Sequence, residues 1–143
     1  MSVTPEDEGF LRRAIELAGT ARSAGQEPYG SLLVGPDGSV LVTDYNTVRA
    51  DGDISAHPEQ KLARWASREL DADTAAGTTM YTSCQPCAMC TGAIDRSGLG
   101  RVVFAMSNEQ FAQLYPSAVF GSVPQDGPAL LHEARVPLDG FYA

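Results

Sequence analysis

Apolar residues follow a helical spacing near the start of the chain and then gather in short continuous runs. A helix is predicted to begin at Thr4-Pro5 and to end near Gly25, because apolar residues recur within it every three or four positions: Phe10, Leu11, Ala14, Ile15, Leu17 and Ala18. The apolar runs at 31–34 and 39–44 flank a Gly-Pro-Asp-Gly turn sequence, which predicts a hairpin of two largely buried strands. The chain is therefore expected to open with one helix and one hairpin.

The rest of the chain alternates helical and strand patterns before the signal weakens. Helices are predicted at 57–70 and 87–96, and strands at 78–83 and 101–105. A strand, a helix and a strand in this order place the two strands parallel, with a right-handed crossover between them. Beyond residue 105 the pattern predicts, in chain order, a helix at 108–115, a loop at 116–128, a short helix at 129–134 and an edge strand at 136–138.

Length and composition favour a single domain over residues 1–143. A chain of 143 residues with 43% hydrophobic composition is long enough for one core and short for two. The first residues lack the basic and apolar parts of a secretory signal, and no run of about 18 apolar residues occurs. We therefore expect a soluble, cytoplasmic protein without a membrane partner. Its three cysteines, an odd number, argue against a disulfide framework.

The formal net charge of −8 argues against a nucleic-acid partner, because proteins bind nucleic acids mainly by neutralising phosphates with Lys and Arg. A local basic patch would have to come from residues on the two middle helices and beyond. We interpret these side chains as solvated helix faces and ordinary ion pairs: Lys61, Arg64, Arg68, Arg96 and Arg101.

Two short segments carry the residues for metal-dependent chemistry. The first reads His57-Pro58-Glu59, and the second reads Pro86-Cys87-Ala88-Met89-Cys90. A catalytic zinc site has three protein ligands and an open fourth position for water, whose pKa the metal lowers toward about 7. His57, Cys87 and Cys90 satisfy this count for one Zn²⁺ per chain. Glu59 lies two residues from His57 and is predicted to carry protons without binding the metal.

Two other interpretations of these cysteines remain open. Cys87 and Cys90 form a Cys-x-x-Cys pair, which in other contexts is a redox motif. A closed structural zinc site could instead use Cys84, Cys87 and Cys90 with one histidine. Against that site, Cys84 is expected at the end of a strand and Cys87 at the start of the next helix, so the three thiols need not converge. Such a site would also leave Glu59 without a role.

His-x-Glu followed by Pro-Cys-x-x-Cys is the pattern of zinc deaminases. With it, the chain resembles the cytidine deaminase superfamily, and within it the free-base branch that includes guanine deaminases and fungal cytosine deaminase. The likeness also includes Asn46 and two longer segments, namely Glu27-Pro28-Tyr29-Gly30-Ser31 and the run from Met80 to Ile94. The resemblance implies an α/β protein with a three-layer α/β/α cytidine-deaminase-like fold and a central mixed five-stranded sheet.

The resemblance also implies roles for residues around the metal. His57, Cys87 and Cys90 would bind zinc, and Glu59 would protonate a ring nitrogen and then the leaving amine. Asn46 matches an asparagine that hydrogen-bonds the bound base, and Tyr29 either lines the pocket or packs beside it. Pro58 stands where relatives usually have Ala or Gly, whose backbone N–H looks like a donor to the substrate, and proline has no such group.

The C-terminal part has no clear counterpart. Relatives often close the pocket with residues of this region, sometimes from a partner subunit, and form homo-oligomers, so we expect a homodimer. Candidates for such a role are Phe111, Tyr115, Phe120, Asp139, Phe141 and Tyr142. His132 is expected to be an ordinary histidine away from the site.

The expected function is zinc-dependent hydrolytic deamination of a free aminated base or related N-heterocycle: guanine, isoguanine, cytosine or an aminotriazine. One alternative is a transfer RNA adenosine deaminase, against which the negative charge argues. Another is a non-catalytic binding module stabilised by zinc, which would tolerate the loss of Glu59 and would show a fourth protein ligand.

Overall fold

The computed structural model describes residues 2–142, and its first helix begins as the sequence predicts. Helix α1 (Pro5–Ser23) has Thr4 as its N-cap. The Thr4 side chain accepts a hydrogen bond from the Asp7 N–H, and the Asp7 carboxylate accepts one from the Thr4 N–H. This reciprocal capping satisfies two backbone donors that the first turn of a helix otherwise leaves unpaired.

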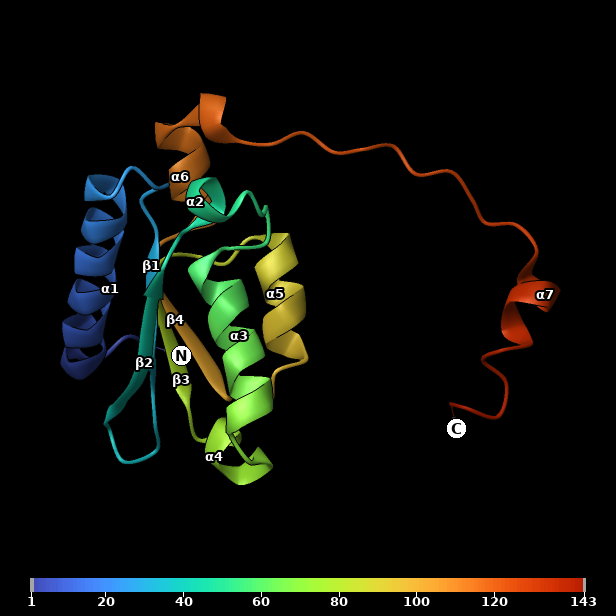
Figure 1. Ribbon diagram of the computed structural model, residues 1–143, viewed down its shortest axis with the longest axis horizontal. Helices are drawn as coiled ribbons and strands as arrows, with labels where there is room; N and C mark the ends of the chain where they lie inside the picture. Colours follow the sequence, from blue (N-terminus) through green and yellow to red (C-terminus); the bar gives the residue numbers. More distant parts are fainter. Residues whose placement is uncertain (1, 143) are drawn as a thin grey trace.

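Four strands form one mixed sheet in the order β2-β1-β3-β4 (Figure 1). They are β1 (Gly30–Val34), β2 (Val40–Tyr45), β3 (Thr79–Cys84) and β4 (Arg101–Met106). Strand β1 is antiparallel to both of its neighbours, and β3 is parallel to β4. The hairpin and the parallel β-α-β unit are thus confirmed.

The predicted fifth strand is wrong. Residues 136–138 lie in turns after helix α7 (Leu131–Arg135), and the sheet within residues 2–142 has four strands, not five. Pro137 has no N–H to give to a strand ladder. The extended segment before α7 also carries these residues far from the sheet (Figure 1).

Helices cover both faces of the sheet. Helix α1 packs on one face, whereas α3 (Pro58–Glu69) and α5 (Ala88–Asp95) lie side by side on the other (Figure 1). Two short helices were not predicted, α2 (Val48–Asp51) and α4 (Ala72–Ala76). Each is about one turn long, too short to show a helical period in the sequence.

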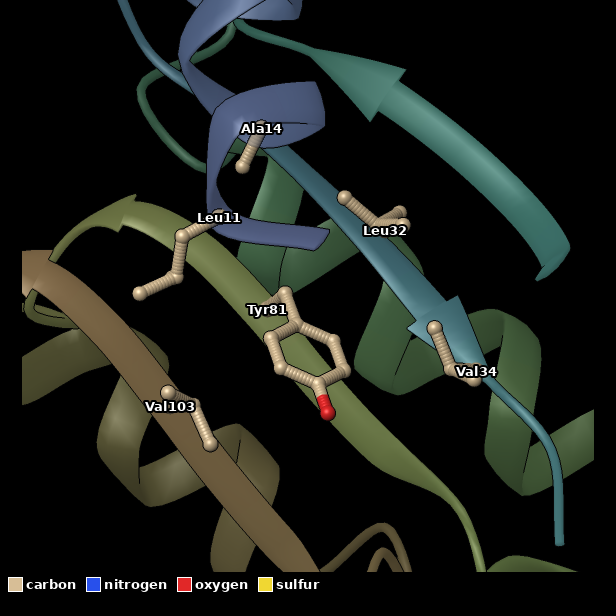
Figure 2. Close-up of a cluster of buried hydrophobic side chains, with 6 residues drawn as sticks. All are labelled: Leu11, Ala14, Leu32, Val34, Tyr81 and Val103. Carbon is tan, nitrogen blue, oxygen red and sulfur yellow. The ribbon is translucent and has the colours of Figure 1, made fainter. Parts of the chain in front are cut away.

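The core is divided by the alternation of side chains along the central strands. Toward α1, Leu32 and Tyr81 pack with residues of the helix and of β4 (Figure 2). Toward α3 and α5, Leu33 and Met80 pack against Leu62 and its neighbours. The same alternation turns Ser31 and Thr82, which are paired across β1 and β3, toward α3.

Strand β2 corrects one expectation about burial. Both strands of the hairpin were predicted to be largely buried, and every residue of β1 is buried. In β2, Val40 and Leu41 are exposed and the other residues are half-buried. Strand β2 lies at the edge of the sheet, with a neighbour on one side only, which explains its exposure.

The chain leaves the body of the molecule, residues 2–115, after helix α6 (Asn108–Leu114). This helix is confirmed, and the 3-10 helix η1 (Pro116–Ala118) opens the segment predicted as a loop. Helix α7 begins two residues later than predicted. We call residues 116–142 the C-terminal arm; all of them are exposed, and the arm projects away from the sheet and its helices (Figure 1). None of the helices described within residues 2–142 combines the length and apolar character needed to cross a membrane.

Candidate active site

The starts of α3 and α5 bring the three predicted metal ligands together. His57 is the N-cap of α3, Cys87 is the N-cap of α5, and Cys90 lies in the first turn of α5. The ligand atoms of these three residues all lie within 4.8 Å of one another. The two motifs, which are 30 residues apart in the chain, therefore form one group.

The spacing of this group fits a tetrahedral zinc ion. His57 Nδ1 is 3.7 Å from Cys87 Sγ and 3.5 Å from Cys90 Sγ. Zinc bonds of about 2.05 Å to nitrogen and about 2.3 Å to sulfur, at a tetrahedral angle, place these atoms about 3.6 Å apart. Both separations match this value. The three residues can hold the metal and leave one position for water.

Cys84 lies outside this group. Its thiol is half-buried at the end of β3, and it is not among the ligand atoms that converge within residues 2–142. Burial raises the pKa of the Cys84 thiol, and the Glu59 carboxylate adds to the effect. The closed site with three thiols is therefore not the arrangement seen.

The two cysteines on α5 are electrostatically unequal before a metal binds. The Cys90 thiol donates to Cys87, and with a smaller contribution from His57 this lowers the pKa of Cys87 to about 3. The same contact raises the pKa of Cys90, and Cys87 raises that of His57. The surroundings thus favour the thiolate form of Cys87, and metal binding would displace the proton of Cys90.

Glu59 is held beside the metal group by hydroxyls from two strands. Its carboxyl is buried, with 6% of the residue exposed. Ser31 Oγ donates to Glu59 Oε1 at 3.1 Å, and Thr82 Oγ1 lies 3.4 Å from the same oxygen and 2.8 Å from Ser31 Oγ. Burial raises the pKa of Glu59, and the bonds from its own N–H and from Ser31 partly oppose this rise. A carboxyl held in this position can serve as a proton carrier for a group bound at the metal.

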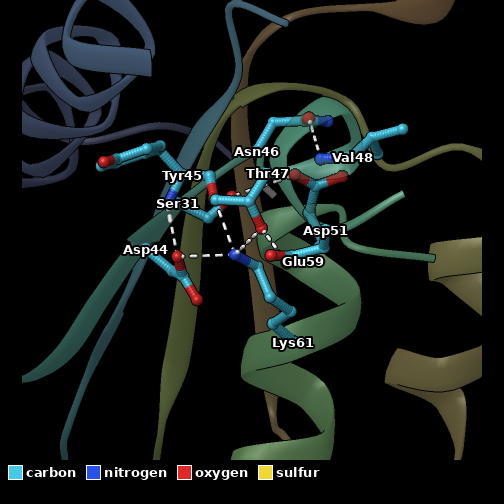
Figure 3. A network of polar contacts seen from close by, with 9 residues as sticks. All are labelled: Ser31, Asp44, Tyr45, Asn46, Thr47, Val48, Asp51, Glu59 and Lys61. Atoms are coloured by element: carbon cyan, nitrogen blue, oxygen red, sulfur yellow. Dashed lines mark hydrogen bonds and ion pairs between the residues drawn. The ribbon is translucent and has the colours of Figure 1, made fainter. Parts of the chain in front are cut away.

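Asn46 presents a buried amide donor with nothing to bind. The residue is 1% exposed, and its Oδ1 accepts from the Val48 N–H at 2.9 Å (Figure 3). That bond fixes the amide orientation, because only the oxygen can accept. Asn46 Nδ2 is then left without a hydrogen-bond partner in the part of the chain described. A buried unpaired donor costs about 1–3 kcal/mol, which a ligand acceptor would recover.

The remaining predicted residues fall into two groups. Pro58 is fully buried at the first position of α3, and the half-buried Tyr29 ring lies 6.4 Å from the ring of Phe111, which in turn is 5.5 Å from that of Tyr115. Burial raises the pKa of Tyr29 to about 12, so its hydroxyl stays protonated. The other candidates lie on the exposed arm, away from the metal group: Phe120, His132, Asp139, Phe141 and Tyr142.

Sequence reasoning missed the roles of Ser31, Thr82 and Lys61. Ser31 and Thr82 contact the Glu59 carboxyl, and Lys61 contacts the residues on either side of Asn46. Strand alternation could have found the first two, because they lie on the same face as the helix that carries Glu59. The side-chain oxygen of Gln85, the residue after β3, accepts a hydrogen bond from the Asn108 N–H at the start of α6.

Several known proteins are similar to this chain in sequence or in structure. Residues 4–106 match the family described as the cytidine and deoxycytidylate deaminase zinc-binding region. A probable cytosine deaminase of Schizosaccharomyces pombe is 32% identical over 159 residues, covering 98% of this chain and 94% of the relative. A tRNA-specific adenosine deaminase of Haemophilus influenzae is 32% identical over 102 residues, covering 71% of this chain and 59% of the relative. The X-ray structure of guanine deaminase from Bacillus subtilis superposes with a TM-score of 0.74 at 29% identity, covering 94% of this chain and 92% of that one.

The family match spans α1 to β4 and so includes every element that carries the metal group, Glu59 and Asn46. These relatives are deaminases, which hydrolyse C–N bonds, and the matched region is a zinc-binding one. The expected resemblance is thereby confirmed. The chain belongs to the cytidine and deoxycytidylate deaminase family and is a zinc-dependent hydrolase of C–N bonds.

Proposed function

We propose that the chain deaminates a free aminated nucleobase or a related N-heterocycle, in the class of guanine, isoguanine, cytosine and aminotriazines. The observation that carries this proposal is Glu59, a buried carboxyl with a raised pKa next to three residues spaced for zinc. His57, Cys87 and Cys90 would hold a zinc ion, which when bound would lower the pKa of a water molecule for attack on an amidine carbon. Ammonia leaves, and a carbonyl replaces the amino group.

Glu59 moves the protons of this reaction. Its carboxylate takes a proton from the attacking water and delivers it to the ring nitrogen next to the reacting carbon. It then transfers the second proton to the amino group, which leaves as ammonia. Ser31 and Thr82 limit the motion of the carboxyl because their hydroxyls hold Oε1 from the sheet side. Such a positioned acid–base typically contributes about 10²–10⁴-fold to rate.

Asn46 orients the base. Its free Nδ2 is a donor, so it binds a ring nitrogen or carbonyl oxygen of the substrate. Pro58 offers no N–H beside it. We propose that the pocket therefore favours bases whose acceptors suit the single Asn46 donor. A Pro58→Ala variant with an unchanged substrate profile would remove this part of the proposal.

A transfer RNA adenosine deaminase is the second candidate, favoured by the 32% identity to the Haemophilus protein. The net charge of −8 favours the free base, because a transfer RNA would have to be held by positive side chains. The non-catalytic module is less well supported, because it gives no reason to bury a carboxyl beside an open metal position.

The test is a competition between the two substrate classes. Zinc-loaded protein is offered each free base and an anticodon stem-loop containing the target adenosine, and ammonia and inosine are measured. The proposal expects ammonia from one or two free bases and no inosine in the RNA. Inosine in the RNA without turnover of any free base would instead show that the chain is a transfer RNA adenosine deaminase.

We also propose that residues 1–143 act as one deaminase domain that assembles as a homodimer through its arm. Exposed apolar side chains on the arm include Phe120, Val123 and Phe141, which are 91%, 85% and 79% exposed. A hollow of about 600 Å³ near α1 and α6, lined in part by Ile15, Met106 and Leu114, offers apolar surface on the body. An interface that covered both the arm residues and the hollow would bury apolar patches of a kind that monomeric proteins rarely expose.

The two metal-binding thiols must stay reduced, which favours a cytoplasmic location.

A further inference from the structure

Lys61, the only lysine of the chain, links the two halves of the site. It lies on α3, four residues after His57 and two after Glu59. Its Nζ reaches the segment around Asn46 and donates to three oxygens: Asp44 Oδ1 at 2.9 Å, the Tyr45 carbonyl at 2.9 Å and Thr47 Oγ1 at 3.0 Å (Figure 3). An ammonium has three N–H donors, so all of them are used.

These contacts hold the backbone on both sides of Asn46. The Tyr45 carbonyl and the Asn46 N–H belong to one peptide plane. The carbonyl accepts from Lys61, and the N–H donates to the Tyr29 carbonyl at 3.0 Å. Because this planar peptide group is hydrogen-bonded at both its carbonyl and its N–H, it cannot rotate without breaking one of the two hydrogen bonds. On the other side, the Thr47 hydroxyl accepts from Lys61 and donates to Asp51 at 2.6 Å.

We propose that Lys61 is a positioning residue that sets the place of Asn46 relative to Glu59 and the metal group. The proposal rests on the proposed function, in which Asn46 binds the base. Lys61 does not touch the base itself. It fixes the segment that carries Asn46 to the helix that carries His57 and Glu59, so that the donor and the reacting groups face one substrate at a constant separation.

The contacts of Lys61 go beyond an ordinary ion pair with Asp44. The Lys61 side chain is 24% exposed, and only one of its three acceptors, Asp44 Oδ1, is charged. Two of the three acceptors are neutral groups that flank Asn46, so the ammonium is placed to order that segment. Arginine could not replace it, because the planar guanidinium spreads its donors and cannot point three of them from one atom at converging oxygens.

A double-mutant cycle tests the coupling, with Lys61→Met, Asn46→Ala and both together. Lys61→Met is expected to lower kcat/KM about tenfold, as a displaced binding group does, mostly through KM and with one zinc retained. In the Asn46→Ala background the same change should alter kcat/KM by less than about twofold, because the residue through which Lys61 acts is gone.

Arg101→Met is the matched control. Arg101 is 29% exposed and pairs with Asp7 on the opposite face of the sheet, so its loss should lower the Tm and leave KM unchanged. A merely structural Lys61 would behave in the same way. Equal losses from Lys61→Met with and without Asn46, or a fall in kcat alone, would overturn the proposal. A normal KM in Asn46→Ala would instead refute the proposed role of Asn46 in binding the base, and with it the role of Lys61.

Asp44→Asn provides a second variant that keeps an oxygen acceptor for Lys61 on a part-exposed residue. It removes the charge that holds the ammonium, so a smaller rise in KM, about threefold, is expected. If Lys61→Met does not fold, this variant decides: an unchanged KM in folded, zinc-loaded Asp44→Asn would contradict the proposal.

Discussion

The three cysteines are nearly neighbours in the sequence, yet their surroundings give them different chemistry. Cys87 and Cys90 lie at the start of α5 with His57, whereas Cys84 ends strand β3 and lies outside the group of converging ligand atoms. Spacing along the chain identified the metal group because Cys-x-x-Cys at a helix start converges locally. It did not identify Ser31, Thr82 or Lys61, whose contacts join residues 14 to 51 positions apart.

Cysteine variants should distinguish the metal ligand Cys90 from Cys84, which lies close by in the sequence but outside the metal group. Cys90→Ser is expected to lose bound zinc and all activity, because the thiolate contributes directly to the metal bond. Cys84→Ser should keep about one zinc per chain, as expected for a residue outside the coordination sphere. Metal content by mass spectrometry after dialysis against a weak chelator gives the result. Loss of zinc from Cys84→Ser would restore the closed site with three thiols.

Among the elements, α1 is the one whose attachment to the sheet can be dissected residue by residue. Long elements with clear periods, including α1, α3, β3 and β4, follow their sequence patterns. The short α2 and α4 depend on tertiary contacts, and 136–138 has strand-like residues but no strand to pair with. Besides its buried apolar face, α1 contacts the sheet through the close approach of Gly30 and the pair of Asp7 with Arg101.

Gly30→Ala should loosen α1. A Cβ at residue 30 would lie 2.5 Å from Leu17 Cβ and 2.6 Å from the Ala14 carbonyl oxygen, so the helix or the strand must move. Overpacking of this kind costs about 1–3 kcal/mol. Gly9→Ala is the control, because nothing lies within 4 Å of its Cβ and alanine favours the helix. Urea unfolding should show opposite signs for the two variants, and equal stability would refute the close packing.

The pair of Asp7 and Arg101 predicts a pH dependence. Arg101 donates to both Asp7 oxygens at 2.9 Å and holds the pKa of Asp7 well below its ordinary value of 3.8. A lowered folded-state pKa stabilises the protein above pH 3.8, and this stability is lost as the pH falls toward the folded-state pKa. Arg101→Met should therefore cost about 2 kcal/mol at pH 7 and much less near pH 2. Urea titrations at both values measure the gap, and a constant gap would contradict the assignment.

At the scale of the whole molecule, the body and the arm have opposite character. The body buries its apolar residues on both faces of the sheet, whereas the arm exposes them. Sequence patterns alone could not foresee this, because the arm has apolar residues like any core segment, yet no other part of residues 2–142 covers them. The negative net charge, by contrast, follows directly from the composition, and it favours a free base over a nucleic acid as the substrate.

Phe120→Asp should weaken self-association. Phe120 is 91% exposed, so a charge there has no cost in the single chain but would oppose burial against a second copy. Sedimentation velocity is expected to show dimers for the unaltered protein and a shift of about tenfold or more toward monomer for the variant. Arg135→Ala on the same arm is the control, since its side chain is 57% exposed and already paired with Asp139. A monomeric unaltered protein would contradict the proposed dimer.

The most direct test of the central claim is ammonia release from the panel of free bases by zinc-loaded protein and by Glu59→Ala at equal zinc content. The account predicts turnover of one or two bases by the unaltered protein and a loss of about 10²–10⁴-fold in kcat for the variant, with zinc retained. Equal turnover by both proteins would remove Glu59 from the reaction. Silence of both across the panel would contradict deamination of a free base.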